Sequence, residues 1–246
     1  MPLENGSLIL VDYTAKVKDT NEVFDTTQEE QAKKTNFYDP THKYEPRLVS
    51  IGEGWVLKGL DEALSNANVS DKLNVEVPPE KGFGKRDDSK IRMIPQRKLG
   101  DKAHEVGVGD EIELDSRRAI VRYVGSGRIQ VDFNHRFAGK TLLYDVNVLK
   151  KLDSDKERVV ALLKRRMGLD ESKLQIDLTS SNLEIVLPED AYLAEGLQIV
   201  KRAVANDIFK FVPAIKNVKF IETYSAPPED KKDEQPKVEA TAEAKQ

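Results

Sequence analysis

The chain has 246 residues, of which 39% are apolar and 33% are charged, and its formal net charge is −4. This content suffices for at least one buried core, and the lack of a long basic block argues against nucleic acid as a partner. The absence of cysteine excludes disulfides, cysteine nucleophiles and thiolate metal sites.

The hydropathy pattern bears on the compartment. No apolar run in the sequence approaches the length of a membrane span. The N-terminus lacks the basic region and apolar core of a secretory signal. We therefore expect a cytoplasmic protein without a membrane partner.

The first expected strand covers residues 8–17, where apolar and polar side chains alternate, so that Ile9, Val11 and Tyr13 share one face. A polar turn follows, and residues 23–24 return the chain to the core. Residues 26–46 then form a long polar connection. Connections of this length are uncommon within compact domains and are often functional.

The stretch from Val49 to Leu64 predicts a short strand, a turn containing Gly52 and Gly54, and one or two helical turns. Its apolar residues fall at helical spacing and are expected to be buried on one face: Val56, Leu57, Leu60 and Leu64. An alternating strand follows at residues 73–77 and stops at two prolines. Phe83 comes shortly afterwards, held between two glycines.

Together these segments resemble the core of the FKBP-type peptidyl-prolyl cis-trans isomerases. Val11–Thr14 resembles the first strand of that fold and Val23–Thr27 its bent second strand. Asn134–Leu142, continuing to Val148, resembles the closing segment of the SlyD-like branch. The chain resembles long archaeal FKBP-type proteins that carry an extra C-terminal domain, closely from Leu8 to about Leu149 and loosely beyond it. The resemblance implies an α+β fold, with a curved antiparallel sheet around a short helix.

Residues 85–133 differ in character from their surroundings. Strands are predicted at 110–115, 119–124 and 129–133, which makes a small, mostly β module near the lower size limit for independent folding. Sequence continuity alone indicates a neighbouring domain, whereas the resemblance implies an insertion in the flap of the isomerase domain. In that family the insertion holds unfolded chains on exposed apolar residues; the candidates here are Ile91, Met93, Ile94, Leu99, Val106 and Val108. The alternative, that these residues form the module's own core, stays open.

An α-β-β-α-β order is predicted for the C-terminal region. Ser154 and Glu157 form a capping box before the first helix, and Gly168 ends it. Pro188 opens a second helix. The buried stripe of that helix is expected to be Leu193, Leu197, Val200, Val204 and Ile208, and the last strand to carry Val218, Phe220 and Tyr224. Because this domain is small, we expect it to pack on the rest of the chain or on a second copy.

The expected division of the chain follows from these elements. The isomerase domain takes residues 1–84 and 134–150, and the insert takes 85–133. The C-terminal α+β domain takes 151–225. Residues 226–246, rich in Pro, Glu, Lys and Ala without periodicity, are predicted to be a disordered tail.

The chemistry that the resemblance implies needs no nucleophile. Rotation about a prolyl peptide bond has a barrier of about 20 kcal/mol. The twisted amide has a less polar carbonyl than the planar one, so a dry aromatic pocket binds the transition state better than the ground state. By resemblance the catalytic groove is lined by Tyr13, Phe24, Asp25, Val56, Leu57, Leu60, Phe83 and Tyr144, with Phe137 as a substrate-binding wall. Without the resemblance, most of these would be interpreted as core residues.

Two positions depart from the family pattern. The usual floor tryptophan is Leu60 here, as in the SlyD-like branch. The usual tyrosine between the two glycines is Phe83, which removes one hydroxyl donor. Because a neutral hydrogen bond contributes about 0.5–1.5 kcal/mol, weaker catalysis is expected. The alternative function is a weakly catalytic or non-catalytic peptide-binding chaperone that uses the same groove.

No cofactor or metal is expected. His42, His104 and His135 are scattered along the sequence, and no set of carboxylates has ligand spacing. The expected partners are unfolded or partly folded polypeptides that contain proline. Self-association through the C-terminal domain is a further hypothesis.

Overall fold

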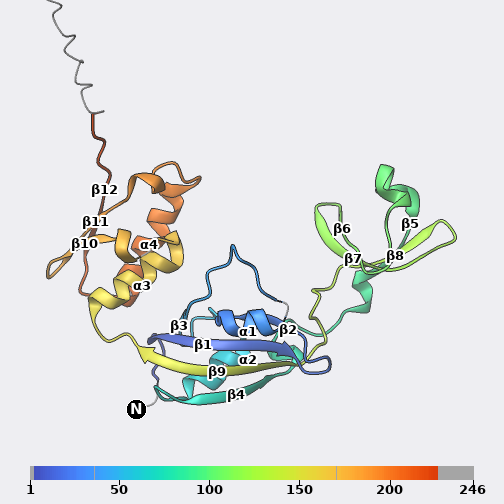
Figure 1. The fold of residues 1–246 in the computed structure, drawn as a ribbon, viewed down its shortest axis with the longest axis horizontal. Coiled ribbons are helices and arrows are strands. Elements are labelled where there is room, and N and C mark those ends of the chain that lie inside the picture. Colours follow the sequence, from blue (N-terminus) through green and yellow to red (C-terminus); the bar gives the residue numbers. More distant parts are fainter. Residues whose placement is uncertain (1–2, 36, 170, 227–246) are drawn as a thin grey trace, which may run out of the picture.

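The computed structural model describes residues 3–35, 37–169 and 171–226. Within these ranges the chain forms a central sheet, with two further sheets lying on either side of it in an elongated molecule (Figure 1). Helices and antiparallel strands are mixed throughout, which confirms the α+β class. The predicted tail falls outside the described residues, apart from Ala226.

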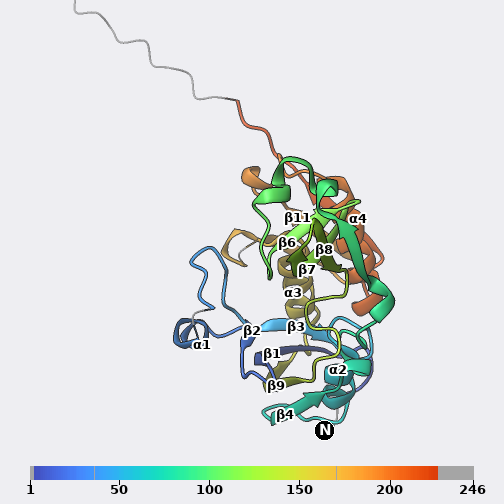
Figure 2. The ribbon, with the colours of Figure 1, turned by 90° about the vertical axis from the view of Figure 1, so that its right-hand side faces the viewer.

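The central sheet contains five strands: β1 (Leu8–Val17), β2 (Val23–Thr26), β3 (Arg47–Ser50), β4 (Lys72–Val77) and β9 (Leu142–Lys151). β1 pairs antiparallel with β2, β3 and β9, and β9 pairs antiparallel with β4. Helix α2 (Lys58–Ser65) packs on one face of this sheet. Helix α1 (Glu29–Lys34) and the long connection after it project to one side (Figure 2).

Strand β1 contributes to two cores because its side chains alternate between the two faces of the sheet. Ile9 and Val11 point to the face covered by α2 and pack with Leu60. Leu8 and Leu10 point to the opposite face, where they join the core of the C-terminal domain. The C-terminal domain therefore packs on the rest of the chain, one of the two arrangements expected from its small size.

The four-stranded sheet of the insert has the order β5-β8-β7-β6, with every pair antiparallel. Its strands are β5 (Ile91–Pro95), β6 (Glu111–Leu114), β7 (Arg117–Gly125) and β8 (Arg128–Asp132). The three predicted strands are present, and β5 is an additional one. Periodicity missed β5 because Met93 and Ile94 are adjacent apolar residues and Pro95 follows them, so the alternation is too short to indicate a strand. Short 3-10 helices flank β5 at Asp88–Lys90 and Gln96–His104, and a third, Pro79–Lys81, follows β4.

The C-terminal domain has the predicted order: α3 (Asp155–Met167), β10 (Gln175–Leu178), β11 (Asn182–Val186), α4 (Leu197–Phe211) and β12 (Asn217–Ile221). β11 pairs antiparallel with β10 and parallel with β12. The Ser154 hydroxyl accepts a hydrogen bond from the Glu157 N–H (3.2 Å), and Gly168 ends α3 at φ 66°. The Glu157 carboxylate pairs with Lys150, and hydrogen bonds to Lys150 and to Ser154 lower its pKa, as a capping box between Ser154 and Glu157 requires.

Two predictions for this domain are wrong. Pro188 leads into a short 3-10 helix, Glu189–Ala191, and α4 begins only at Leu197. Leu193 consequently lies before α4 and is 95% exposed, so it is not part of the buried stripe. Tyr224 lies beyond β12 and is exposed as well. The finer domain boundaries stay predictions.

Candidate active site

An aromatic cluster lies where β1, β2 and β9 meet the segments that flank the insert. The Tyr13 and Tyr144 ring centroids are 5.8 Å apart, and Phe24 meets Tyr144 edge-on at 6.2 Å. Phe24 also contacts Phe137 at 4.4 Å, and Phe137 lies 5.6 Å from Phe83. Strand pairing explains part of this convergence, since Ala15 is opposite Tyr144 on β9 and Asp25 on β2.

The turn before α2 forms another wall of this groove. Gly52 has φ 77°, and a Cβ there would lie 2.8 Å from the Asn5 side chain, so glycine is required at this position. The Gly52 N–H donates to Asp61 on α2 (2.9 Å), which fixes the turn against the helix. Val56 and Leu57 precede α2, and Leu60 lies in its first turn.

These walls enclose a groove of about 530 Å³. All nine side chains predicted to line it are brought together there: Tyr13, Phe24, Asp25, Val56, Leu57, Leu60, Phe83, Phe137 and Tyr144. Their catalytic roles stay predictions. The structure adds five residues that sequence patterns had not assigned to the groove: Arg47, Gly54, Trp55, His135 and Arg136.

The polar rim of the groove is a hydrogen-bonded triad. The Tyr13 hydroxyl donates to Asp25 Oδ2 at 2.6 Å, and the Arg47 guanidinium contacts both the Tyr13 hydroxyl and Asp25. Burial and the hydrogen bond to Asp25 raise the pKa of Tyr13. Burial alone would lower the pKa of Arg47, but Tyr13 and Asp25 raise it above its ordinary value. The triad therefore keeps one proton on Tyr13 and a positive charge on Arg47.

Tyr144 differs from Tyr13. Its hydroxyl makes no hydrogen bond to any residue that the structure describes, although the side chain borders the groove. Burial, reinforced by Asp25, raises the pKa of Tyr144. A protonated hydroxyl with no internal acceptor is a donor that a bound peptide carbonyl can use.

His135 lies flat against Phe83, with ring centroids 4.1 Å apart and planes 11° from parallel. The Phe137 N–H donates to His135 Nδ1 (3.3 Å), which assigns the proton of the neutral ring to Nε2. Burial and the neighbouring Arg136 lower the pKa of His135. Sequence patterns alone do not assign this histidine to the groove. Its position two residues before Phe137 was the available signal.

The four predicted substrate-binding residues of the insert lie outside the groove. Ile94 is 8% exposed and belongs to the core of the insert, so it is corrected from a surface contact to a core residue. Leu99 packs against the same core, and Ile91 is half-buried. Met93 is 49% exposed on β5. Among the other two candidates, Val108 is 66% exposed and Val106 is half-buried.

A buried carboxylate ties the insert to the central sheet. Asp132 accepts hydrogen bonds from Arg86 (2.5 Å), Arg122 (3.2 Å) and the Asn134 N–H (3.0 Å). Burial alone would raise the pKa of Asp132, but the bonds from Asn134 and the two arginines lower it. Arg86 and Asn134 lie on the two segments that connect the insert to the isomerase domain. Asp132 therefore holds both connecting segments in place.

No group of three or more His, Cys, Asp or Glu side chains in the described ranges is arranged to hold a metal ion. No helix there is long and apolar enough to cross a membrane. The groove thus offers apolar walls, one unengaged hydroxyl and a fixed polar rim.

Two known protein families match parts of this chain. Residues 2–149 match the family described as FKBP-type peptidyl-prolyl cis-trans isomerase. The chain belongs to this family. Residues 155–225 match a second family, described as FKBP26_C-terminal. This FKBP-type isomerase therefore carries an extra C-terminal domain, as the resemblance implied.

Named relatives agree with this assignment. A short-type peptidyl-prolyl cis-trans isomerase of Methanocaldococcus jannaschii is 34% identical over 146 residues, which cover 59% of this chain and 92% of the relative. An FKBP-type 16 kDa isomerase of Escherichia coli is 26% identical over 152 residues, or 60% and 93% of the two chains. The isomerase SlyD of Treponema pallidum is 28% identical over 170 residues, or 67% and 87%.

Proposed function

We propose that this FKBP-type isomerase catalyses prolyl rotation in the aromatic groove and that its insert holds unfolded clients beside it. The observation that carries the catalytic part is a cluster of packed aromatic side chains beside the Tyr144 hydroxyl, which makes no hydrogen bond within the described residues. A proline ring fits against Phe24 and Phe137, with Leu60 beneath it. The amide then lies in a space with few water molecules.

Selective binding of the twisted amide supplies the rate enhancement. The planar amide has a strongly polar carbonyl and loses more hydration energy on entering an apolar groove than the twisted amide does. The Tyr144 hydroxyl donates to the substrate carbonyl and fixes its orientation. Tyr13 has a different part, because its proton is engaged by Asp25. It supports the groove wall and positions Asp25 and Arg47.

A prolyl-peptide isomerisation assay with protease coupling tests this mechanism. Tyr144→Phe removes the donor but keeps the ring, and should lower kcat/KM several-fold, as a hydrogen bond of about 0.5–1.5 kcal/mol implies. Tyr38→Phe, at an exposed tyrosine outside the groove, is the matched control and should leave short-peptide turnover unchanged. Wild-type turnover near the uncatalysed rate, with peptide binding retained, would instead support the peptide-binding chaperone that the missing hydroxyl at Phe83 favours.

Client holding by the insert rests on its exposed apolar side chains. Met93, Val108 and Tyr123 are each at least 49% exposed, and Met adapts to varied partners because it is unbranched and polarizable. These residues sit on a module tied to the groove through Asp132. We expect the clients to be proline-containing unfolded polypeptides in the cytoplasm.

Self-association of the C-terminal domain is proposed on similar grounds. Leu193, which precedes α4, and Ile199, in the first turn of α4, are both strongly exposed. Deleting the domain would uncover Leu8 and Leu48, so a point change is the better test. If Ile199 lies in the interface, Ile199→Lys should reduce the mass measured by light scattering.

A further inference from the structure

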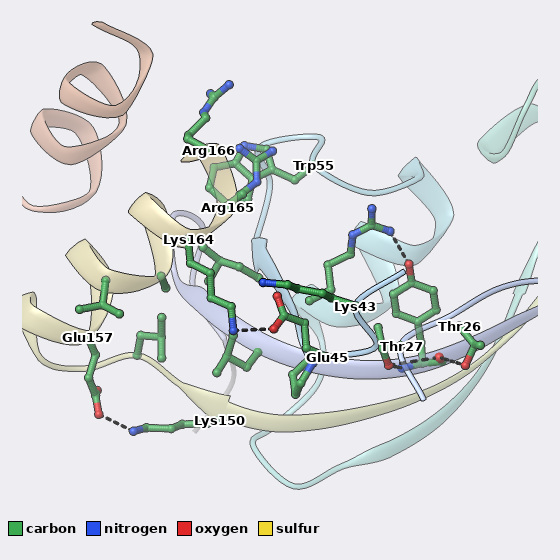
Figure 3. A pocket seen from close by; sticks show the side chains of 18 of the residues that line it. Thr26, Thr27, Lys43, Glu45, Trp55, Lys150, Glu157, Lys164, Arg165 and Arg166 are labelled. Carbon is green, nitrogen blue, oxygen red and sulfur yellow. Dashed lines mark hydrogen bonds and ion pairs between the residues drawn. The ribbon is translucent and has the colours of Figure 1, made fainter. Parts of the chain in front are cut away.

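A second, larger cavity adjoins the isomerase groove. It measures about 1020 Å³ and lies between the β1 to β3 region and helix α3 of the C-terminal domain (Figure 3). Tyr13, Asp25, Arg47 and Trp55 border both cavities. A peptide that leaves the groove past Arg47 and Trp55 therefore enters this cleft.

Basic side chains predominate around the cleft. Seven line it: Lys43, Arg47, Lys150, Lys156, Lys164, Arg165 and Arg166. Only three acidic side chains do: Asp25, Glu45 and Glu157. The cleft thus has a local excess of positive charge in a chain whose net charge is −4.

Several of these cations are already engaged. Lys164 pairs with Glu45 across the domain junction (2.6 Å), and Lys150 pairs with Glu157. Arg166 holds Asp207 of α4 through two hydrogen bonds (2.7 and 3.2 Å). Arg165 and Lys156, by contrast, make no ion pair with any residue in the described ranges. Both belong to α3.

Arg165 is the more informative of the two. Its guanidinium lies 3.7 Å from the centroid of the Trp55 ring, which holds it at the boundary between the groove and the cleft (Figure 3). Burial, together with the positive charges of Arg166 and Arg47, lowers the pKa of Arg165. Burial and the neighbouring arginines therefore act against the positive charge of Arg165, and a carboxylate bound beside it would offset that effect.

We propose that this cleft binds an acidic segment of the client polypeptide, flanking the proline that occupies the groove, with Arg165 and Lys156 as its carboxylate-binding residues. The inference rests on the proposed function, because it assigns a sequence preference to the same substrate. Apolar side chains between the cations, including Leu10, Leu48 and Val160, suit the backbone and side-chain stems of a peptide better than a small inorganic anion.

The test compares two short peptides that share one proline and differ only in their flanks, several glutamates against the same number of glutamines. Trp55 is the only tryptophan of the chain and borders both cavities, so its fluorescence reports binding without requiring turnover. At low salt the glutamate peptide should bind about fivefold more tightly, as expected for two partly exposed charge pairs. The ratio should approach one at about 1 M salt, where screening acts over about 3 Å.

Variants assign the preference to the cleft. Arg165→Gln combined with Lys156→Gln should bring the affinity ratio close to one, whereas Arg165→Lys, which keeps the charge, should retain most of it. The matched control is Arg202→Gln with Lys72→Gln, which removes the same charge from exposed sites on α4 and β4. This control should keep the full preference.

Each outcome has a definite meaning. Equal affinities at low salt would overturn the proposal, as would a preference that survives in the cleft variant or disappears equally in the control. Tight binding of a glutamate peptide that lacks proline would refute the claim that one peptide occupies the groove and the cleft together. Prolyl turnover is measured separately; its absence would refute the isomerase mechanism, while the affinity ratio would still decide whether the cleft binds acidic segments.

Discussion

The hydrogen bond between Tyr13 and Asp25 should be measurable as a coupling free energy. The two atoms are 2.6 Å apart, and the acceptor is a carboxylate. Hydrogen bonds to charged groups contribute about 1.5–3 kcal/mol. The Asp25 side chain is 38% exposed, and solvent weakens such bonds, so we expect a coupling of about 1–1.5 kcal/mol.

A double-mutant cycle with Tyr13→Phe and Asp25→Ala isolates this value. Each single change should lower the free energy of unfolding by about 1–1.5 kcal/mol, and the double variant should be little worse than either single one. Urea unfolding followed by Trp55 fluorescence measures all four proteins. The same variants should lower kcat/KM several-fold, because Asp25 also holds Arg47 at the rim of the groove.

Additive losses of stability would refute the reasoning. A coupling below about 0.3 kcal/mol lies within the usual error of additivity and would mean that water satisfies both groups equally well. Tyr38→Phe is a suitable control, since Tyr38 is an exposed tyrosine outside the groove. It should leave both stability and turnover close to those of the unaltered protein.

Three further predictions address the insert and the groove. Replacing residues 85–133 with a short glycine linker should reduce catalysis of protein refolding far more than turnover of short peptides; equal losses would contradict client holding. Phe83→Tyr should raise peptide kcat/KM by about two- to tenfold, matching one added hydrogen bond, and no gain would mean that Tyr144 already saturates the carbonyl. Because burial and Arg136 depress the folded-state pKa of His135, the unfolded chain binds its proton more readily. The melting temperature should therefore fall as pH drops below about 6.5, and His135→Phe should flatten that dependence between pH 5 and 7.

Much of the groove could be predicted because its residues belong to local motifs with characteristic spacing. Phe83 between its glycines and Leu60 on a helical stripe are examples. Arg47 and Arg165 could not be found in this way. Arg47 is remote in sequence from Tyr13 and Asp25, and meets them only because β3 and β2 both pair with β1. Arg165 reaches Trp55 only because the C-terminal domain packs on the sheet.

The errors in the fold have local physical causes. A proline followed by two acidic residues is a sound helix start, but the chain after Pro188 forms one 3-10 turn, and Gly196 adopts φ 73° before α4 begins. Helical spacing predicts that Leu193 belongs to the buried stripe of α4. The break between the 3-10 turn and α4 interrupts that spacing. In the insert, Ile94 was a candidate for client contact because periodicity alone does not distinguish a core residue from a surface contact on a strand as short as β5.

The position of strand β1 between two cores determines how the molecule unfolds on heating. Ile9 and Val11 belong to one core, and Leu8 and Leu10 belong to the other. If either core unfolds, β1 is lost and the other core loses the side chains that β1 supplies to it. The core of the insert shares no residue with these two cores. Scanning calorimetry should therefore record one joint heat-absorption peak for the sheet and the C-terminal domain, with the insert melting separately. A substitution such as Leu8→Ala should move the joint peak alone.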